Sequence, residues 1–160
     1  MKNYVPTKEW MAYAIGALGQ GMVYAIMSSY ISDFYLNVLK LTPIFVLLLV
    51  LLARIWDAAI DPILGYYMDR ANPKHGKLKS YIIYTPIPIA VLTILLFYSP
   101  DLSGGALMAY CVITYLLWST VYSVSDVPFW SLPNLMTPNP DERGAIVSRA
   151  RTSNGVGSAI

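Results

Sequence analysis

The sequence has little of what hydrolases, disulfide-bonded proteins and nucleic-acid-binding proteins need. Its one cysteine, Cys111, can form no disulfide within the chain, so cysteine usage says nothing about the compartment, and we expect a small packing residue. The one histidine, His75, lies in a polar segment without a nucleophile partner, which leaves a hydrolytic triad unsupported. The Gly-x-Gly-Asp motif of intramembrane aspartyl proteases is also absent. We therefore expect no enzyme and no cofactor.

Charged residues are scarce as well, and hydrophobic ones are abundant. Only 12% of the 160 residues are charged, 56% are hydrophobic, and the mean hydropathy is +0.52. The net charge is +2 and no basic run alternates with aromatic residues, so we expect no nucleic-acid partner. A helix needs about 20 mostly apolar residues to cross a bilayer. The composition therefore predicts an all-α, polytopic membrane helix bundle whose partner is the lipid bilayer.

The predicted organisation is part of one amino-terminal domain over residues 1–160, with four transmembrane helices and the start of a fifth. The apolar stretches lie near 11–36, 43–68, 80–99 and 106–134, and a fifth begins after about residue 144. The segment before the fifth, "NLMTPNPDERG", contains two prolines followed by Asp141 and Glu142. This pattern predicts a turn and then a helix with an acidic first turn.

The distribution of basic residues predicts the orientation. Lys2 and Lys8 precede the first span, and the connection "DRANPKHGKLKS" holds Arg70, Lys74, Lys77 and Lys79. By contrast, the connection near 37–42 has only Lys40, and "SPDLSGG" has no lysine or arginine. Because basic loops stay inside, we expect a multi-pass protein of the cell (inner) membrane with a cytoplasmic amino terminus.

The second span contains three ionisable residues, Arg54, Asp57 and Asp61, within "ARIWDAAIDP". A charge near the bilayer centre costs at least about 2.5–3.5 kcal/mol, so each of these side chains requires a structural or functional explanation. At about 100° per residue, Asp57 and Asp61 lie about 40° apart, and Arg54 lies within about 60° of Asp57. A structural ion pair would explain Arg54 and one aspartate. Two carboxylates one turn apart would also bind a small cation or hold a proton.

The fourth span repeats the anomaly in "VYSVSDVPFWSLP". Tyr122, Ser123, Asp126 and Trp130 lie on a stripe about 100° wide. A carboxylate accepts hydrogen bonds from sugar hydroxyls while an indole covers the apolar face of the ring. The alternative is that Asp126 is a structural acid and Trp130 an interfacial anchor.

Three separated segments carry a resemblance to one family. "ARIWDAAIDPILGYYMDR", "DRANPKHGKLKSY" and "SDVPFWSLPNLMTPNPDERG" resemble, in this order, the amino-terminal part of the glycoside-pentoside-hexuronide:cation symporters of the major facilitator superfamily, which include the melibiose permeases. The similarity covers nearly the whole chain. A further pattern of Gly65, Asp69, Arg70, Gly76 and Lys77 resembles the superfamily's cytoplasmic loop motif.

The resemblance implies roles for named residues. It implies that Asp57 and Asp61, helped by Ser123, form the cation site, and that Asp126, Trp130 and Arg151 line the sugar site. The helical stripe adds Tyr122 to the expected sugar site. Periodicity places Arg149 and Arg151 about 200° apart and cannot choose between them. Only the resemblance favours Arg151, and we expect Arg149 to extend toward the cytoplasmic surface.

The sequence departs from the melibiose permeases at two places. Gln20 and Gly21 stand where those permeases have a lysine and a sugar-binding aspartate, and Ile60 replaces an asparagine of the sodium site. The loss of an oxygen ligand favours H+ over Na+, because a proton needs only one carboxylate. The prediction is a proton-coupled symporter for a sugar or glycoside other than melibiose, with Na+ at Asp57 and Asp61 as the alternative.

The family implies twelve spans in two halves that rock about a central site. The glycines of the first span, Gly16, Gly19 and Gly21, would allow close helix approach or bending. The loop motif would latch one conformation, or would simply be a solvated basic loop. Because the chain stops inside the fifth span, we expect a missing carboxy-terminal half. The competing hypothesis is a truncated membrane fragment that transports nothing by itself.

Overall fold

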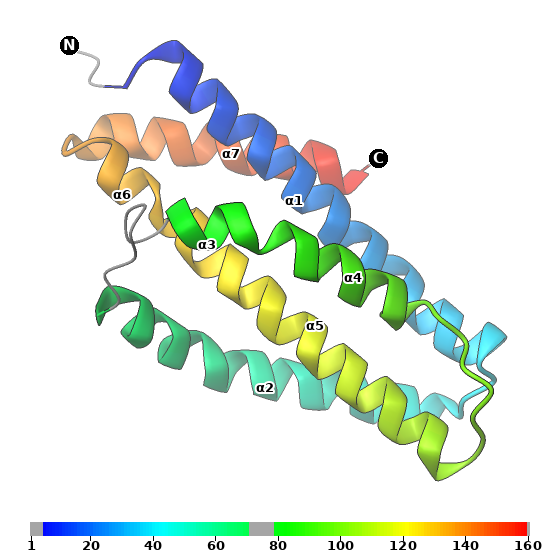
Figure 1. The fold of residues 1–160 in the computed structure, drawn as a ribbon. Coiled ribbons are helices and arrows are strands. Elements are labelled where there is room, and N and C mark those ends of the chain that lie inside the picture. The colour runs from blue at the N-terminus through cyan, green and yellow to red at the C-terminus, as the bar shows by residue number, and fades with distance from the viewer. Residues whose placement is uncertain (1–4, 71–78, 160) are drawn as a thin grey trace. The chain divides into compact units, whose positions relative to one another are not determined.

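The computed structural model describes residues 5–70 and 79–159, without the side chains of Asp69 and Lys79. Within these ranges the regular structure is entirely helical, which confirms the predicted all-α class. In chain order the elements are α1 (Thr7–Asp33), the π-helical turn η1 (Phe34–Val38), α2 (Pro43–Arg70), α3 (Lys79–Tyr84), α4 (Pro86–Leu96), α5 (Gly105–Ser131), α6 (Pro133–Met136) and α7 (Pro140–Ala159) (Figure 1). They form two compact units, the α2–α5 unit of residues 31–129 and the α1–α7 unit of residues 1–30 and 130–160.

Three helical segments of the described chain are long and apolar enough to cross a membrane. They are Thr7–Val38, Pro43–Met68 and Gly105–Met136, and they overlap the predicted spans 11–36, 43–68 and 106–134. The helix expected after residue 144 begins earlier, at Pro140, and α7 is too polar over its length to join this group. Its entry into the membrane stays a prediction.

The predicted span 80–99 contains two consecutive helices, where a single one was expected. α3 ends at Tyr84 and α4 begins at Pro86, and Thr85 separates them. Proline has no N–H to continue the hydrogen-bond ladder, although it fits the first position of a new helix. Both the backbone N–H and the hydroxyl of Thr85 donate to the carbonyl of Tyr81, at 3.1 and 2.8 Å. The apolar part, α4, has 11 residues, so the crossing of the membrane by this stretch also stays a prediction.

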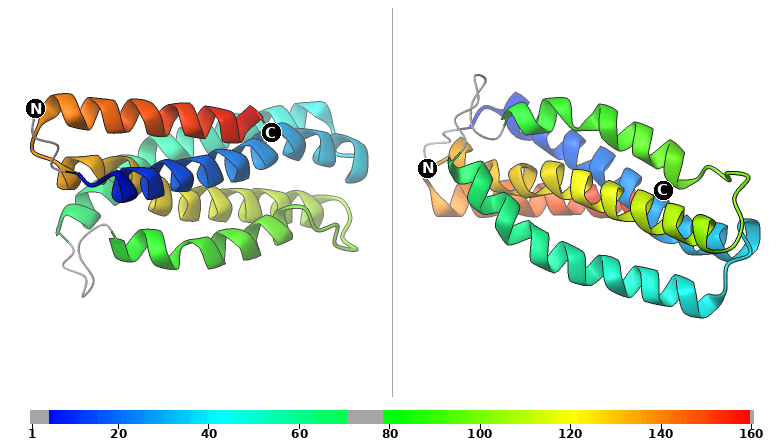
Figure 2. Two further views of the ribbon diagram at one scale, coloured as in Figure 1. Left: turned by 90° about the horizontal axis from the view of Figure 1, so that it is seen from above. Right: turned by 60° about the horizontal axis from the view of Figure 1, so that its bottom comes forward.

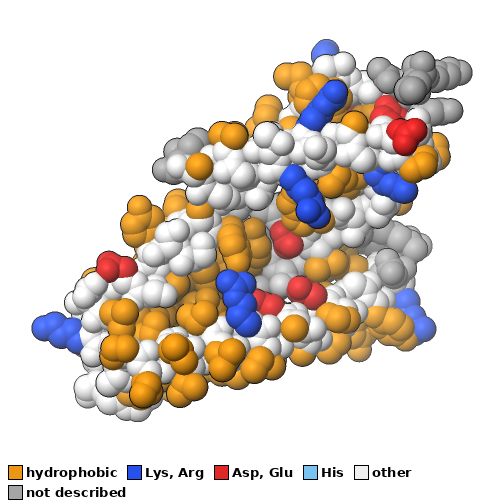
Figure 3. All heavy atoms as spheres, turned by 180° about the vertical axis from the view of Figure 1, so that it is seen from behind, with side chains coloured by type: hydrophobic (Ala, Val, Ile, Leu, Met, Phe, Trp, Pro, Cys, Tyr) orange, Lys and Arg blue, Asp and Glu red, His pale blue; other side chains and the backbone are white. Residues whose placement is uncertain are grey.

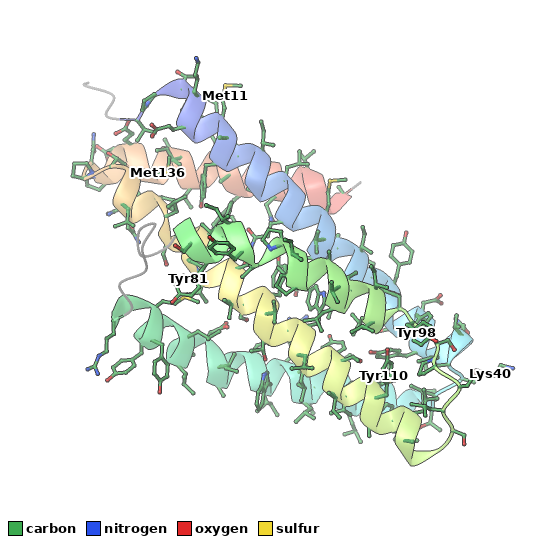
Figure 4. All side chains as sticks on the ribbon, viewed as in Figure 1. Met11, Lys40, Tyr81, Tyr98, Tyr110 and Met136 are labelled. Carbon is green, nitrogen blue, oxygen red and sulfur yellow. The ribbon has the colours of Figure 1, made fainter. Side chains whose placement is uncertain are left out.

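In the α2–α5 unit, α5 lies between α4 and α2 (Figures 1 and 2). On the α4 side, the Trp118 indole donates to the Thr93 hydroxyl at 2.9 Å, and the Tyr110 hydroxyl donates to the carbonyl of Leu95 at 2.6 Å. Figure 4 labels Tyr110 near Tyr98, at the end of the unit where α4 leads into α5. Trp118 and Cys111 are buried, and Cys111 is the packing residue that the sequence predicted. Aromatic side chains of α5 thus fix its position against α4.

One side of α2 presents aliphatic side chains to the exterior. Ile44, Leu47, Leu51 and Ile55 are all exposed, while Ala53 is buried. Their spacing of three or four residues forms a continuous stripe along the helix. Figure 3 shows hydrophobic side chains along the lower edge of the visible face, over α2. A stripe of this kind is stable against hydrocarbon, which agrees with a membrane-spanning helix.

The α1–α7 unit pairs two helices that run in the same direction (Figures 1 and 2). The bonds between these two parts of the chain keep a constant separation in sequence. Val5 bonds Glu142, Ala17 bonds Asn154, and Gly21 bonds Ser158, each 137 residues apart. A constant separation is the signature of a parallel pair, because both helices advance equally per residue.

Two glycines allow these helices to approach each other closely. A Cβ on Gly21 would lie 2.2 Å from the carbonyl oxygen of Asn154, and one on Gly157 would lie 2.2 Å from that of Leu18. No other residue fits at either position without moving a backbone. The close approach expected of the first-span glycines therefore occurs at Gly21, whereas a Cβ on Gly19 would meet open space.

The start of α7 confirms the predicted turn and acidic helix start. Asn139 precedes the helix, and its side-chain oxygen accepts the backbone N–H of Asp141 at 3.0 Å. Pro140 occupies the first helical position, and Asp141 and Glu142 lie in the first turn. The Glu142 carboxylate also accepts the Thr137 hydroxyl at 2.6 Å and the Val5 N–H at 3.1 Å. Glu142 thus ties the segment before α1 to the beginning of α7.

Candidate functional site

A polar contact between side chains joins two apolar helices, α2 and α5. The Ser119 hydroxyl donates a short hydrogen bond to Oδ1 of Asp57. Asp57 is half-buried and Ser119 is buried. Trp56 precedes Asp57 on α2 and Thr120 follows Ser119 on α5, and the Trp56 indole donates to the Thr120 hydroxyl at 2.9 Å. Two neighbouring residues of α2 are therefore bonded to two neighbouring residues of α5, and the Asp57 carboxylate lies at this crossing.

The other charged residues of the predicted cation site follow from the helical geometry of α2. Asp61 lies one turn after Asp57 and is exposed, and Arg54 lies one turn before it and is also exposed. Helix α2 continues through Pro62 without ending, so the three residues keep the common face that the sequence predicted. Within residues 5–70 and 79–159, no three His, Cys, Asp or Glu side chains gather as a metal-binding group.

The hydroxyl that contacts Asp57 is not the one that the sequence singled out. Ser123, the predicted helper, is buried one turn further along α5, and Ser119 makes the contact. The two serines are four residues apart and share a helix face. The sequence held one signal for Ser119, its spacing from Ser123, but the register of α5 against α2 was needed to choose it.

The predicted sugar-site residues of α5 lie along one stretch of the helix. The Tyr122 ring stacks on Trp118, with centroids 4.9 Å apart and an angle of 10° between the rings. Asp126 is half-buried, and Trp130 follows it by one helical turn. Pro128 between them is buried inside α5, which continues to Ser131.

The two arginines of α7 meet different aromatic rings, both within the α1–α7 unit. The Arg151 guanidinium lies over the Trp130 ring, 5.8 Å from its centroid. The Arg149 guanidinium lies over the Trp10 ring at 4.6 Å. Both distances fall within the range of cation–π attraction. The structure thus brings Arg151 to a predicted sugar-site residue and Arg149 to the beginning of α1.

The cytoplasmic loop motif is only partly described. Gly65 and Arg70 belong to α2, and the Arg70 guanidinium lies 4.1 Å from the centroid of the Tyr66 ring. The side chain of Asp69, together with Gly76 and Lys77, lies outside the described residues.

These features define a class of protein, a helical multi-pass membrane protein that carries acidic side chains within its apolar spans. Acids in such positions mark the pathways of ions and substrates. A family model described as "MFS/sugar transport protein" matches residues 12–160, and the chain belongs to this family.

Curated relatives extend the similarity. The chain is 31% identical over 141 residues to a putative glycoside/cation symporter, YagG, of Escherichia coli (strain K12), which covers 88% of the chain and 31% of the relative. It is 30% identical over 159 residues to the isoprimeverose transporter of Lactiplantibacillus pentosus, covering 99% of the chain and 33% of the relative. The glucuronide carrier protein homolog of E. coli is 24% identical, covering 100% of the chain and 34% of the relative. The chain therefore spans about a third of the length of these relatives.

Proposed function

We propose that the protein to which these residues belong takes up a small sugar together with a cation by alternating access. The observation that carries this proposal is the Asp57 carboxylate, which lies in an apolar span and is bonded by a second span through Ser119. A carboxylate in an apolar span is energetically costly, so acidic residues found there are usually functional. Cation binding is the function that suits a carboxylate at a contact between two spans. The names of two relatives, a putative glycoside/cation symporter and an isoprimeverose transporter, support the same class. The function is transport rather than catalysis.

For the coupling cation, we propose Asp57 and Asp61 as the carboxylates and Ser123 as the neighbouring hydroxyl. The proton is favoured over sodium because Ile60 supplies no oxygen beside the two acids. Cation binding and sugar binding should strengthen each other, since coupling free energy is reciprocal.

For the sugar, we propose a surface made of Tyr122, Asp126, Trp130 and Arg151. The Asp126 carboxylate would accept hydrogen bonds from sugar hydroxyls, and the Trp130 indole would cover an apolar face of the ring. The contact between Arg151 and Trp130 supports a shared role, because a guanidinium over an indole has its N–H groups free to donate outward. The substrate class is a glycoside, pentoside or hexuronide other than melibiose.

The proposed location is the inner membrane with a cytoplasmic amino terminus, from the distribution of lysine and arginine. On the cytoplasmic side, the motif of Gly65, Asp69, Arg70, Gly76 and Lys77 would stabilise one conformation of the transporter. The contact between Arg70 and Tyr66 at the end of α2 supports a role for the first part of this motif in holding the end of α2 in place.

The test of coupling is the Asp57→Asn variant of the protein that contains this chain. Isoprimeverose and a glucuronide, taken from the relatives' names, serve as first labelled substrates. We expect Asp57→Asn to lose accumulation against a gradient, because an amide takes up no proton and brings no negative charge to hold a cation. Asp101→Asn, in the exposed connection before α5, is the matched control and should accumulate normally.

If Asp57→Asn accumulates sugar as the wild type does, the coupling role is wrong. If added sodium strongly lowers the half-saturating sugar concentration at fixed pH, the preference for protons is wrong.

The second candidate is a truncated membrane fragment that inserts but does not transport. A product of only this length would not transport, because alternating access requires a closed pathway and these residues cover about a third of each relative's length. The intact mass of the product made from the native locus decides between the two. A mass about three times the 17.8 kDa of these residues supports transport with a carboxy-terminal half, and a mass of 17.8 kDa without a partner supports the fragment.

A further inference from the structure

Ser119 differs from the other hydroxyl residues near it on α5. The hydroxyls of Thr114 and Thr120 both donate to the carbonyl one turn earlier in their own helix, at 2.8 Å. That local bond is the usual one for a threonine or serine inside an apolar helix. Ser119 lies between these two residues, yet its hydroxyl donates across the helix crossing to Asp57.

A hydroxyl that donates to a carboxylate stabilises the ionised, cation-free form of that carboxylate. The effect is large in an apolar span, where little water can replace the bond. A bound cation satisfies the same oxygen and makes the donor unnecessary. The hydroxyl then still has an acceptor, the backbone carbonyl of Tyr115 one turn earlier, which is the arrangement that Thr114 and Thr120 adopt.

We propose that Ser119 is a positioning residue for cation release, a role that rests on the proposed function. By lowering the free energy of the empty Asp57 carboxylate, its hydroxyl weakens cation binding enough for the cation to leave after each transport cycle. Without the Ser119 hydroxyl, the free energy of the empty carboxylate would be too high, and the cation would stay bound.

The neighbours of Asp57 on its own helix are charged, whereas Ser119 is a neutral donor. On α2, Arg54 and Asp61 lie one turn before and one turn after Asp57, and both are exposed. On α5, the one charged residue is Asp126, seven residues after Ser119, which is an acid and cannot donate when ionised. Ser119 is therefore the neutral donor that the structure assigns to Oδ1 of Asp57.

The experiment compares Ser119→Ala with the wild type in the protein that contains this chain, in membrane vesicles. The cation concentration that gives half-maximal sugar uptake should fall about tenfold, the factor that corresponds to losing one hydrogen bond to a charged group. Net accumulation should slow, since it requires cation release. Exchange of internal for external sugar should continue at the wild-type rate, because exchange does not require release of the cation.

Three further variants separate this role from packing. Ser119→Thr keeps the hydroxyl and should restore the wild-type values. Thr120→Val removes the neighbouring contact with Trp56 and should leave the half-saturating cation concentration unchanged. If Ser119→Ala fails to insert, Ser119→Cys, which has nearly the same size and a weaker donor, takes its place with the same expected direction.

An unchanged or raised half-saturating cation concentration in Ser119→Ala would overturn the inference, as would equal losses of exchange and accumulation. These outcomes differ from a failure of the proposed function. In that case Asp57→Asn itself would accumulate sugar normally, whatever Ser119→Ala does.

Discussion

At the scale of single residues, the two arginines of α7 show how close neighbours in sequence acquire different surroundings. Arg151 lies over Trp130 and Arg149 lies over Trp10, because residues two apart on a helix point in nearly opposite directions. An arginine over an indole is held in place and keeps its hydrogen-bond donors directed outward. The ring that each arginine meets therefore decides what its guanidinium can bind.

This pair gives a matched test of the proposed sugar site. We expect Arg151→Lys to raise the half-saturating sugar concentration at least about fivefold, because an ammonium cannot reproduce the planar guanidinium over Trp130. Arg149→Lys should change it by less than about twofold, because Trp10 is not among the proposed sugar contacts. The measurement is the initial rate of labelled isoprimeverose uptake against its concentration. Equal effects of the two changes would contradict the assignment.

Asp57 and Ser119 mark what the sequence could and could not predict about the site. An aspartate in an apolar helix is an anomaly in hydropathy, so Asp57 could be found without a structure. A serine in the same setting is ordinary, because its hydroxyl can bond its own backbone. Ser119 acquires its partner only through the register of α5 against α2, and helical periodicity within one helix contains no information about that register.

At the scale of helices, the glycines of the α1–α7 unit act as fixed contact points. Gly157 and Gly21 each face a backbone carbonyl oxygen, while Gly155 and Gly19 face open space. On each helix, the glycine that close packing requires lies only two residues from a glycine that packing does not require.

This contrast predicts opposite results for the same substitution. Gly157→Ala should destabilise the helix pair by about 1–3 kcal/mol or more, since its Cβ would lie 2.2 Å from the Leu18 oxygen and a backbone would have to move. Gly155→Ala should be neutral or stabilising by up to about 1 kcal/mol, because alanine favours the helix.

The measurement is the temperature at which the detergent-solubilised protein loses its monodisperse elution peak. Gly21→Ala against Gly19→Ala repeats the comparison on α1 and should give the same pattern. Equal stability of Gly157→Ala and Gly155→Ala would show that the helices are not as close as described.

The helices also show the limits of hydropathy. Long apolar stretches predicted α1, α2 and α5 well, because length and composition decide whether a segment can cross a bilayer. The stretch 80–99 has a similar composition, but Pro86 interrupts its hydrogen bonds and divides it into α3 and α4. The missing N–H of Pro86 therefore determines where the helix breaks, and the mean hydropathy of the segment cannot reveal this.

At the scale of the whole molecule, the orientation predicted from the basic residues can be measured directly. Cys111 is buried in α5, so it should react little with a membrane-impermeant maleimide, and the test uses a background without any other cysteine. We expect Ser103→Cys, in the exposed connection before α5, to react in intact cells. Lys8→Cys, exposed at the start of α1, should react only after the cells are permeabilised. The reverse pattern would show that the amino terminus lies outside.

The constant separation of 137 residues between bonded positions of the α1–α7 unit has a consequence for biosynthesis. Synthesis proceeds from the amino terminus, so α1 enters the membrane long before its partner exists. The Gly21–Ser158 bond cannot form until residue 158 has left the ribosome. The α2–α5 unit, whose last residue is 129, is complete by then. During translation, the face of α1 that contains Gly21 therefore stays uncovered until α7 has been made.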